Sequence, residues 1–512
     1  MQPSRTCLAV PLTSAQPPLV TQMAAAAAAG ADLVELRVDR IGDVSAVEAA
    51  LRGPRVLPVL LTVRSATEGG AWTGTERERV ALLLRLAALA PDYVDVEAAT
   101  WRSAESVRRW AATRADGTPR LIISQHDLHG TPPEVAAALR ALRAIPADVH
   151  KAVFTAHDAC DALRVAAALA RAPHPERLIV LAMGEAGLVT RILARKFGAF
   201  LTFASLAAGT ESAPGQPTLS DLRALYRWDA VRPDTPLFGV LGWPVSHSLS
   251  PRVHNAALAA SGRAGVYVPL PVGPDAAHWR AFMALAQDPV LDVRGLSVTL
   301  PHKEHAHAWL AAGAGVCSPS AARCRAVNTV WHDPAAGTWR GDNTDAQGVQ
   351  AALAASLSEG VAALQGRTAS VLGAGGVARA VVAVLTDRGC RVTVFNRTMG
   401  RALALAREFG CEARPWEARS APADVVVNCT PVGLWPDVEA TPLADEDLPC
   451  GGVVMDTIYR PRETRLLRAA RARGCVVVDG VEMFIQQAAA QFVQWHGVAA
   501  PLAAMRAAIA DL

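Results

Sequence analysis

The feature that most constrains this chain is an alternation, over residues 7–228, of short apolar runs with longer stretches rich in Ala, Leu and Arg. Eight of the runs are predicted strands, each followed by enough residues for a helix and two turns. The predicted strands are Cys7–Leu12, Leu33–Asp39, Val56–Val63, Tyr93–Ala98, Arg120–Asp127, His150–Ala156, Leu178–Gly184 and Ala199–Ala204. Eight β-α units in roughly 220 residues are typical of an α/β protein with a (β/α)8 TIM barrel. A doubly wound sheet is the alternative, although it usually has fewer strands.

Length and composition limit the classes of protein that fit. A chain of 512 residues corresponds to about three domains at roughly 150 residues each. The formal net charge of +3 gives no argument for a nucleic-acid partner or an anionic membrane. The run Ala24–Ala29 is too short to span a bilayer, and Asp32 follows it too closely for a signal peptide. Nine scattered cysteines indicate reduced thiols. We therefore expect a cytoplasmic enzyme without a transit peptide, since a predicted strand already begins at Cys7.

The rest of the chain divides at changes in pattern. Two prolines and several polar residues interrupt the periodicity at 229–236, which indicates a linker after the first domain, 1–228. A new α/β region follows at 237–340. A third region, at 341–480, contains a strand that runs into a Gly-rich turn and a helix. The last segment, 481–512, is predicted to be helical and to complete the middle region.

Lysine is rare in this chain. Of the 50 basic residues only three are lysines, namely Lys151, Lys196 and Lys303. Arginine stays protonated at any useful pH, whereas a lysine can become neutral and nucleophilic or can transfer a proton. Each lysine is therefore a candidate for chemistry.

The predicted barrel strands carry polar residues where apolar ones are expected, as in Glu35 and Arg37, or Asp95 and Glu97. Charges inside a barrel are costly unless paired, and strand ends on one rim are where such barrels keep their sites. An ion-pair network that only stabilises the barrel is the alternative. The chemistry that we expect is imine formation by Lys151, in a dry pocket near other cations. A histidine would move protons, Glu97 would orient its imidazole, and arginines would hold a carboxylate.

This first region resembles type I 3-dehydroquinate dehydratase. The matching pieces are Gly30–Asp39, Ser124-Gln-His-Asp127, Lys151, Thr190-Arg191 and Glu211-Ser-Ala-Pro-Gly-Gln216. The resemblance implies that Lys151 forms a Schiff base with the ring ketone and that His126 is the acid/base. It also implies a substrate-binding set, with the last two residues on a closing loop: Glu35, Arg37, Arg64, Arg191, Ser212 and Gln216. Thr190 stands where the family usually has Ser, which leaves the role of Arg191 intact.

The Gly-rich turn of the third region lies between a predicted strand, Ala369–Leu372, and an apolar helix, Val377–Leu385. Glycines let the backbone approach a pyrophosphate, and the helix N-terminus supplies N–H groups. The next strand ends in Asn396-Arg-Thr398 rather than in the acidic residue that an NAD site uses, and Arg397 suits the 2′-phosphate of NADP. We therefore expect a Rossmann domain that binds NADP. The predicted cofactor-binding residues are Gly373, Ala374, Gly375, Gly376, Val377, Asn396, Arg397, Thr398, Arg401 and Gly480.

Upstream, hydroxyls, an amide and a Lys–Asp pair gather near strand ends. Lys303 follows Thr299 at a strand-to-helix junction, and Asn328 and Asp345 add an amide and a carboxylate. A Lys–Asp pair beside a carbonyl can deliver a proton while a nicotinamide delivers hydride.

Residues 237–512 resemble shikimate dehydrogenase. Further matches are Phe238–Pro251, Asn428-Cys-Thr-Pro431, Asp456 with Tyr459, and Asp479–Met483. The resemblance implies Lys303 and Asp345 as the catalytic pair. It also implies shikimate-binding residues: Ser248, Ser250, Thr299, Asn328, Asp345 and Gln487, with Tyr459 nearby. Ser297 departs from the commoner Asn without affecting a named role. His302, His305 and His307 have a spacing that could suggest a metal, but we expect solvated side chains and no metal.

Together these patterns predict a bifunctional enzyme of the shikimate pathway, in the plant-type fusion order, with small-molecule substrates. The first half would dehydrate 3-dehydroquinate and the second would reduce 3-dehydroshikimate with NADPH. One alternative is a quinate dehydrogenase in the second half, although its relatives tend to replace the second serine, Ser250 here. The other is a non-catalytic regulator that senses metabolites, although Lys151, His126, Lys303 and Asp345 are all present.

Overall fold

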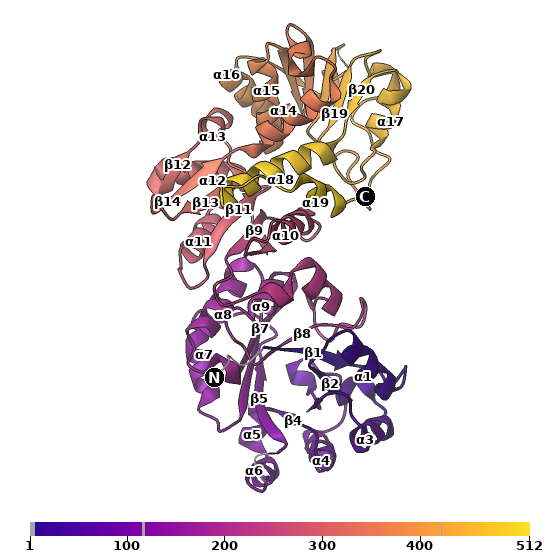
Figure 1. Cartoon of the computed structure of the whole chain (residues 1–512), viewed down its shortest axis with the longest axis vertical. Coiled ribbons are helices and arrows are strands. Elements are labelled where there is room, and N and C mark those ends of the chain that lie inside the picture. Colours follow the sequence, from indigo (N-terminus) through magenta and orange to yellow (C-terminus); the bar gives the residue numbers. More distant parts are fainter. Residues whose placement is uncertain (1–5, 115–117, 421, 512) are drawn as a thin grey trace. The chain divides into compact units, whose positions relative to one another are not determined.

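The computed structural model describes residues 6–114, 118–420 and 422–511. The chain divides into two compact units (Figure 1). Of the residues that the structure describes, the first unit contains those up to Leu237 with 264–273 and 281–293, and the second contains 238–263, 274–280 and those from Arg294 onward. The domain bounds expected from the sequence stay a prediction.

The first unit contains the predicted (β/α)8 barrel. Its strands are β1 (Cys7–Leu12), β2 (Leu33–Arg37), β3 (Val59–Thr62), β4 (Tyr93–Glu97), β5 (Arg120–His126), β6 (Val149–Thr155), β7 (Leu178–Met183) and β8 (Leu201–Phe203). The parallel strands pair in the order β7-β6-β5-β4-β3-β2-β1-β8. The remaining gap is bridged where the N–H of Phe200 donates to the carbonyl of Leu178 at 2.8 Å. β3 begins three residues later than predicted because Pro58 has no N–H to give to the ladder.

Helices cover the outside of these strands (Figure 1). They are α1 (Leu19–Ala28), α2 (Val38–Ile41), α3 (Val44–Arg52), α4 (Glu76–Ala87), α5 (Ala98–Ser103), α6 (Glu105–Ala112), α7 (Val135–Arg143), α8 (Ala159–Arg171) and α9 (Leu188–Leu193). Their starts are set by local signals. Thr75 and Glu78 form a reciprocal capping box at α4, and the side chain of Asp158 accepts the N–H of Asp161 at α8.

The barrel interior is layered along its strands. An apolar layer lies toward their amino ends and includes Leu33, Leu60, Ile122 and Val149. Two residues further along the same strands come the buried polar side chains Glu35, Thr62, Ser124 and Lys151. Because residues two apart share a face of a strand, both layers point inward and the polar one meets the carboxyl-end rim.

The second unit and its adjoining segments contain two further sheets. The first has the order β10-β9-β11-β13-β14-β12, with antiparallel pairs at β11–β13 and β13–β14. Its strands are β9 (Leu237–Gly242), β10 (Val266–Pro271), β11 (Val293–Val298), β12 (Gly315–Cys317), β13 (Thr329–Asp333) and β14 (Thr338–Asp342). Its helices are α10 (Ser250–Ala260), α11 (Ala276–Ala286), α12 (Lys303–Trp309) and α13 (Pro319–Cys324).

The other sheet is parallel, with the order β17-β16-β15-β18-β19-β20. Its strands are β15 (Thr368–Leu372), β16 (Arg391–Asn396), β17 (Glu412–Pro415), β18 (Val425–Asn428), β19 (Val453–Asp456) and β20 (Val476–Val478). In chain order this is 3-2-1-4-5-6, the strand order of a Rossmann fold, which confirms the predicted class. Its helices are α14 (Thr344–Ser356), α15 (Gly376–Asp387), α16 (Met399–Phe409) and α17 (Arg465–Ala472), and the chain ends with α18 (Gly480–His496) and α19 (Leu502–Ala507).

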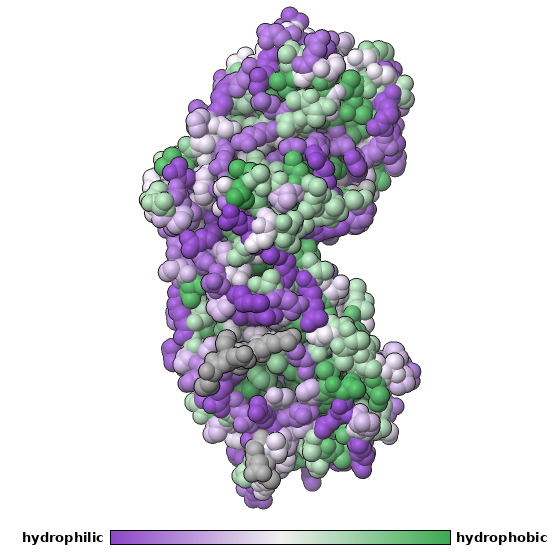
Figure 2. Space-filling view, in the orientation of Figure 1, coloured by the Kyte–Doolittle hydropathy of each residue, from purple (hydrophilic) through white to green (hydrophobic). Residues whose placement is uncertain are grey.

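The surface carries a mixture of residue types. On the face in Figure 2, hydrophilic and hydrophobic residues are interspersed over both units. Among the helices of the described ranges, none has the length and apolar character needed to cross a membrane.

Candidate active sites

The first candidate site is a cavity of about 310 Å3 at the carboxyl ends of the barrel strands. Most of the residues predicted for this site line it: Glu35, Arg37, Arg64, His126, Lys151, Arg191 and Ser212. They come from β2, β5, β6, α9 and the segments after β3 and β8. The barrel topology therefore brings together side chains that lie far apart in the sequence.

Lys151 is buried at the centre of this site. Its Nζ lies 3.1 Å from Oδ2 of Asp95, 3.6 Å from Oε1 of Glu35 and 4.8 Å from the ring centroid of Phe203. Its nearest charged groups are thus carboxylates, not the cations that the sequence suggested. Burial alone would raise the pKa of Asp95, but Arg64 and Lys151 outweigh burial and hold that pKa below its usual value.

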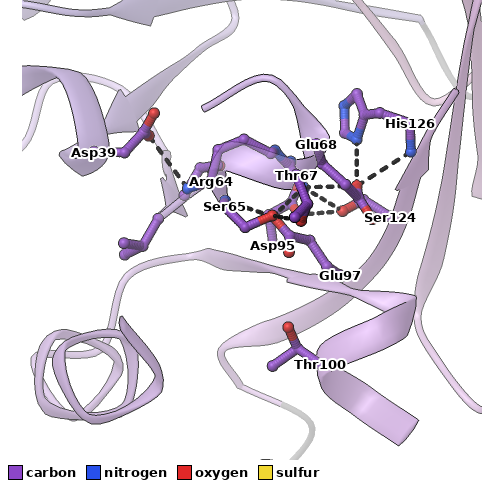
Figure 3. Close-up of polar contacts among 12 residues, drawn as sticks. Asp39, Arg64, Ser65, Thr67, Glu68, Asp95, Glu97, Thr100, Ser124 and His126 are labelled. Carbon is purple, nitrogen blue, oxygen red and sulfur yellow. Dashed lines mark hydrogen bonds and ion pairs between the residues drawn. The ribbon is translucent and has the colours of Figure 1, made fainter. Parts of the chain in front are cut away.

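His126 ends β5, and its partner is Glu68 (Figure 3). The Nδ1 atom lies 2.8 Å from Oε2 of Glu68, and the same oxygen accepts the N–H of His126 at 3.1 Å. When Glu68 is ionised, that oxygen accepts both bonds, so Nδ1 carries the proton and Nε2 is left with a lone pair. Burial and then the charges of Arg64 and Lys151 hold the pKa of His126 well below its usual value. The imidazole is neutral at neutral pH and can act as a base.

The predicted pairing of Glu97 with His126 is wrong. Glu97 instead accepts the N–H of Ser65 at 2.8 Å and pairs with Arg64 at 3.3 Å and with Arg79 at 3.2 Å. The physical reason is that two buried guanidinium groups flank this carboxylate and hold it on their side of the barrel. Glu97 therefore contacts Arg64 and Arg79, and Glu68 is the carboxylate that contacts the imidazole of His126.

Arg64 links the carboxylates of this site. It donates to Asp95 and to the hydroxyl of Ser124, each at 2.8 Å, and lies 3.5 Å from Glu68. Burial alone would lower the pKa of Arg64, but the surrounding carboxylates outweigh it and raise the pKa. Arg64 is already bound on several sides before any substrate enters.

Arg191 differs from Arg64 because its Nε is buried without a hydrogen-bond partner among the described residues. Its residue is 2% exposed, and burial lowers its pKa to about 10. A buried guanidinium that lines a cavity and has an open donor is suited to bind a carboxylate of a substrate. The preceding Thr190 donates to the carbonyl of Gly187 at 2.7 Å and accepts from the N–H of Ala182 at 2.9 Å, so it holds the start of α9.

Two predicted substrate-binding residues have other contacts. Arg37 lines the cavity but also forms two hydrogen bonds with Asp39, of 3.0 and 2.9 Å. Gln216 is not among the lining residues; its Oε1 accepts the N–H of Ser212 at 2.8 Å. Gln216 thus shapes the loop that carries Ser212 over the cavity, while its Nε2 has no partner among the described residues.

The second candidate site is a cavity of about 410 Å3 that contains Lys303, Asp345 and Asn328. Nζ of Lys303 donates to Oδ2 of Asp345, whose other oxygen accepts from Nδ2 of Asn328 at 2.9 Å. Oδ1 of Asn328 accepts the N–H of Thr344 at 2.8 Å, which fixes the orientation of the amide. Both side chains are buried, and their hydrogen bonds hold them in one orientation that suits proton transfer.

The remaining residues predicted to bind the second substrate line the same cavity: Ser248, Ser250, Thr299, Tyr459 and Gln487. The ring of Tyr459 stacks on Phe484, with centroids 4.8 Å apart. Ser297 also lines the cavity, and its hydroxyl donates to Oε1 of Gln491 at 2.7 Å. The lining therefore offers hydroxyls and amides, which suit a substrate with several hydroxyl groups.

The dinucleotide turn fits the predicted cofactor. Gly375 is the N-cap residue of α15 and offers no side chain to its N–H groups, which leaves these donors available to a pyrophosphate. Gly373 has a φ of 110°, and a Cβ there would lie 2.9 Å from the carbonyl oxygen of Cys429. A Cβ on Gly376 would lie 2.9 Å from Cδ of Lys303, so this glycine lets the turn approach the Lys303–Asp345 pair.

The two arginines predicted to read the 2′-phosphate are exposed beyond the end of β16. β16 pairs with β15 through Phe395 and Leu372, so Arg397 and Arg401 follow the strand adjacent to the glycine turn. β16 ends in Asn396 rather than in a carboxylate, and Nδ2 of Asn396 donates to the carbonyl of Thr398 at 2.9 Å. Gly480 begins α18, lines the second cavity and packs on the backbone of Ile458.

Known proteins with related sequences cover both halves of the chain. A family model described as type I 3-dehydroquinase matches residues 7–233. Models for the shikimate dehydrogenase substrate binding domain, shikimate / quinate 5-dehydrogenase and the shikimate 5′-dehydrogenase C-terminal domain match 240–330, 353–432 and 480–510. A chloroplastic bifunctional 3-dehydroquinate dehydratase/shikimate dehydrogenase of Arabidopsis thaliana is 36% identical over 92% of this chain and 79% of its own length. This chain belongs to that bifunctional family.

Other relatives match one half only. The NADP(+) shikimate dehydrogenase of Acidiphilium cryptum is 45% identical over 54% of this chain and 96% of its own length. A solved shikimate dehydrogenase of Thermus thermophilus, in complex with NADP(H) and shikimate, is 40% identical over 54% of this chain and 98% of that chain, with a TM-score of 0.47.

In this member of the bifunctional family, sequence reasoning missed Glu68. The residue lies in a segment after β3 with no periodic pattern, four positions after Arg64. That spacing after a predicted substrate-binding arginine was the one available signal. Burial raises the pKa of Glu68 to about 7, despite the opposing charge of Arg64.

Asp456 is a second buried acid of this family member without a predicted role. Its Oδ1 accepts from Nδ2 of Asn428 at 3.1 Å, and its Oδ2 accepts from the hydroxyl of Thr464 at 2.8 Å. Burial raises its pKa to about 6. The network joins the loops after β18 and β19, beside the proposed cofactor site.

The three histidines near Lys303 are not all solvated, as the sequence suggested. His302 is fully buried, its ring centroid lies 5.8 Å from that of Trp279, and its Nδ1 is 3.1 Å from that of His305. Over residues 6–114, 118–420 and 422–511, no group of three or more His, Cys, Asp or Glu is arranged to hold a metal.

Proposed function

We propose that this chain catalyses two consecutive reactions of the shikimate pathway. The barrel dehydrates 3-dehydroquinate to 3-dehydroshikimate through a Schiff base, and the second half reduces 3-dehydroshikimate to shikimate with NADPH. The observation that carries the proposal is the coexistence, in one member of the bifunctional family, of two complete sites. One holds Lys151 beside a neutral His126, and the other holds the Lys303–Asp345 pair beside a dinucleotide turn.

In the first reaction, Arg191 binds the carboxylate of 3-dehydroquinate. The neutral amine of Lys151, after giving up its proton, attacks the ring ketone, and water leaves as the C=N bond forms. Nε2 of His126 takes a proton from the carbon next to the imine. The same imidazole then protonates the departing hydroxyl group, which leaves as water, and hydrolysis of the imine releases 3-dehydroshikimate and Lys151. Glu68 stabilises the positive imidazolium between the two proton transfers.

In the second reaction, NADPH supplies a hydride to the ketone carbon when it is bound. The N–H groups at the start of α15 would hold its pyrophosphate, and Arg397 with Arg401 would hold the 2′-phosphate. Lys303 donates a proton to the oxygen that develops negative charge, and Asp345 keeps the ammonium aligned with that oxygen. Ser248, Ser250, Thr299, Asn328, Tyr459 and Gln487 bind the hydroxyl and carboxylate groups of the substrate.

The decisive experiment is product analysis after 3-dehydroquinate is supplied with and without NADPH. We expect 3-dehydroshikimate without the cofactor and shikimate with it. Lys151→Ala should stop both products from 3-dehydroquinate but should still reduce added 3-dehydroshikimate. Lys303→Ala should accumulate 3-dehydroshikimate in the presence of NADPH. If the wild-type chain consumes neither substrate, the regulator alternative replaces the proposal.

Quinate is the competing substrate of the second half. It carries one more hydroxyl group than shikimate, and Ser250, which lines the cavity, is the residue that quinate-specific relatives tend to replace. We therefore expect NADP+-dependent oxidation of shikimate to exceed that of quinate. A higher kcat/KM for quinate would assign the second half to quinate instead.

A further inference from the structure

The cavity around Lys303 has an unusual balance of charge. Among the described residues that line it, the Lys, Arg, Asp and Glu side chains are Lys303, Asp345 and Arg460. Lys303 and Asp345 form an ion pair and offset each other. Arg460 therefore supplies the net positive charge of this lining.

Arg460 also differs from the arginines around it. Arg252 pairs with Asp511 at 2.6 Å, Arg462 pairs with Asp479 at 3.3 Å, and Arg471 pairs with Glu463. Arg460 has no ion pair with a carboxylate in the part of the chain that the structure describes. Its charge is thus available to a ligand, whereas those of its three neighbours are already matched.

Trp435 holds this free guanidinium at the opening of the cavity. The Cζ atom of Arg460 lies 5.3 Å from the ring centroid of Trp435, a cation–π arrangement. The backbone N–H of Trp435 donates to the backbone carbonyl of Arg460 at 3.1 Å. The ring of Trp435 lies 6.0 Å from that of His247, centroid to centroid. Arg460 is exposed and directly follows Tyr459, a predicted substrate contact.

We propose that Arg460 captures the substrate carboxylate at the opening of the dehydrogenase cavity and so determines preference for anionic substrates. This inference rests on the proposed function, in which the second substrate is a hydroxylated ring with one carboxylate. An exposed charge at the rim of a cleft attracts an oppositely charged ligand and raises its association rate more than it changes the chemical step. Arg460 therefore acts on kcat/KM and leaves kcat nearly unchanged.

The test compares Arg460→Gln with Arg462→Gln, a matched control whose arginine is already paired with Asp479. Oxidation of shikimate and of its uncharged methyl ester is measured at saturating NADP+. In Arg460→Gln we expect kcat/KM for shikimate to fall about three- to tenfold at low ionic strength, with kcat within about twofold of the wild type. The kcat/KM for the ester should change less than about twofold in Arg460→Gln. Arg462→Gln should leave kcat/KM unchanged for both shikimate and the ester.

Salt and a charge-retaining variant separate a charge effect from a change in structure. Raising NaCl from ~0.02 to ~0.5 M shortens the Debye length from roughly 20 to about 4 Å. The difference in kcat/KM for shikimate between wild type and Arg460→Gln should therefore become smaller. Arg460→Lys should retain most of the wild-type preference for shikimate over its ester, because it keeps the charge.

Three results would overturn the inference: an equal loss for acid and ester, a rise in the KM for NADP+ alone, or no change in Arg460→Gln. Each is distinct from failure of the proposed function, which would appear as a wild-type chain that oxidises neither shikimate nor its ester. That last result would remove the substrate on which the role of Arg460 depends, and would overturn both proposals.

Discussion

Replacement of Arg79 by Met should destabilise the barrel without removing a group that touches substrate. The Arg79 side chain lies behind the first site, is 1% exposed and does not line the cavity. It pairs with the buried carboxylate of Glu97 at 3.2 Å and donates to the carbonyl of Val63 and the hydroxyl of Thr100. Met has a similar length but offers neither charge nor donor, so Glu97 would keep Arg64 as its one cationic partner.

The size of the effect follows from burial. Removing one partner of a buried ion pair costs about 3–5 kcal/mol, because the other charge stays desolvated. The additional pair between Arg79 and Glu76 adds little, since Glu76 is half exposed. With a urea slope of about 3 kcal/mol/M, the unfolding midpoint of the barrel should fall by about 1–1.7 M.

The assay is residual dehydratase activity as a function of urea, with dehydrogenase activity of the same samples as an internal reference. Arg109→Met is the matched control, because Arg109 pairs with Glu105 on an exposed helix face and the change should cost less than about 0.5 kcal/mol. A dehydratase midpoint for Arg79→Met that coincides with the control would refute the reasoning that this buried network stabilises the barrel.

Four further predictions concern the proposed chemistry. Borohydride added with 3-dehydroquinate should attach substrate covalently to Lys151. Lys196 should stay unmodified, because its Nζ donates to two backbone carbonyls. Labelling of Lys196 would contradict the assignment. His126→Ala should still allow this trapping but slow dehydration by ~10²–10⁴-fold, as stopped-flow or steady-state rates would show. Because burial raises the pKa of Glu68 to about 7, dehydratase kcat/KM should fall as the pH drops through that value and Glu68 loses its charge. Glu68→Gln should give a lower kcat/KM that is nearly constant from about pH 6 to 8. If the variant shows the same fall at acidic pH as the wild type, this role of Glu68 is rejected. Arg397→Ala should weaken use of NADP+ roughly tenfold or more while leaving NAD+ nearly unaffected, and equal use of both cofactors by the wild type would show that this loop does not read the phosphate.

Much of the architecture could be predicted from the sequence, because the signals for it are local. Apolar runs of strand length recur eight times in the first region, and the glycine turn after β15 marks the dinucleotide domain. Seven of the eight predicted barrel strands differ from the observed strands by one to three residues at one or both ends. The largest shift is at the start of β3, where Pro58 cannot donate to the ladder. The scarcity of lysine likewise marks Lys151 and Lys303 as candidates for chemistry from composition alone.

Tertiary structure decided which of these side chains meet. From the sequence, Glu97 and Glu68 were both carboxylates near a predicted strand end, but only packing places Arg79 beside the former and His126 beside the latter. The sequence does not single out Arg460 among the many arginines of this chain. It differs from Arg252, Arg462 and Arg471 only in the fold, where each of those three forms an ion pair with a carboxylate. Strand and turn patterns depend on residues a few positions apart in the sequence. Ion pairs, pKa shifts and cavities depend instead on groups that the fold brings together from distant segments. For that reason the chemistry of each site is a property of the folded chain.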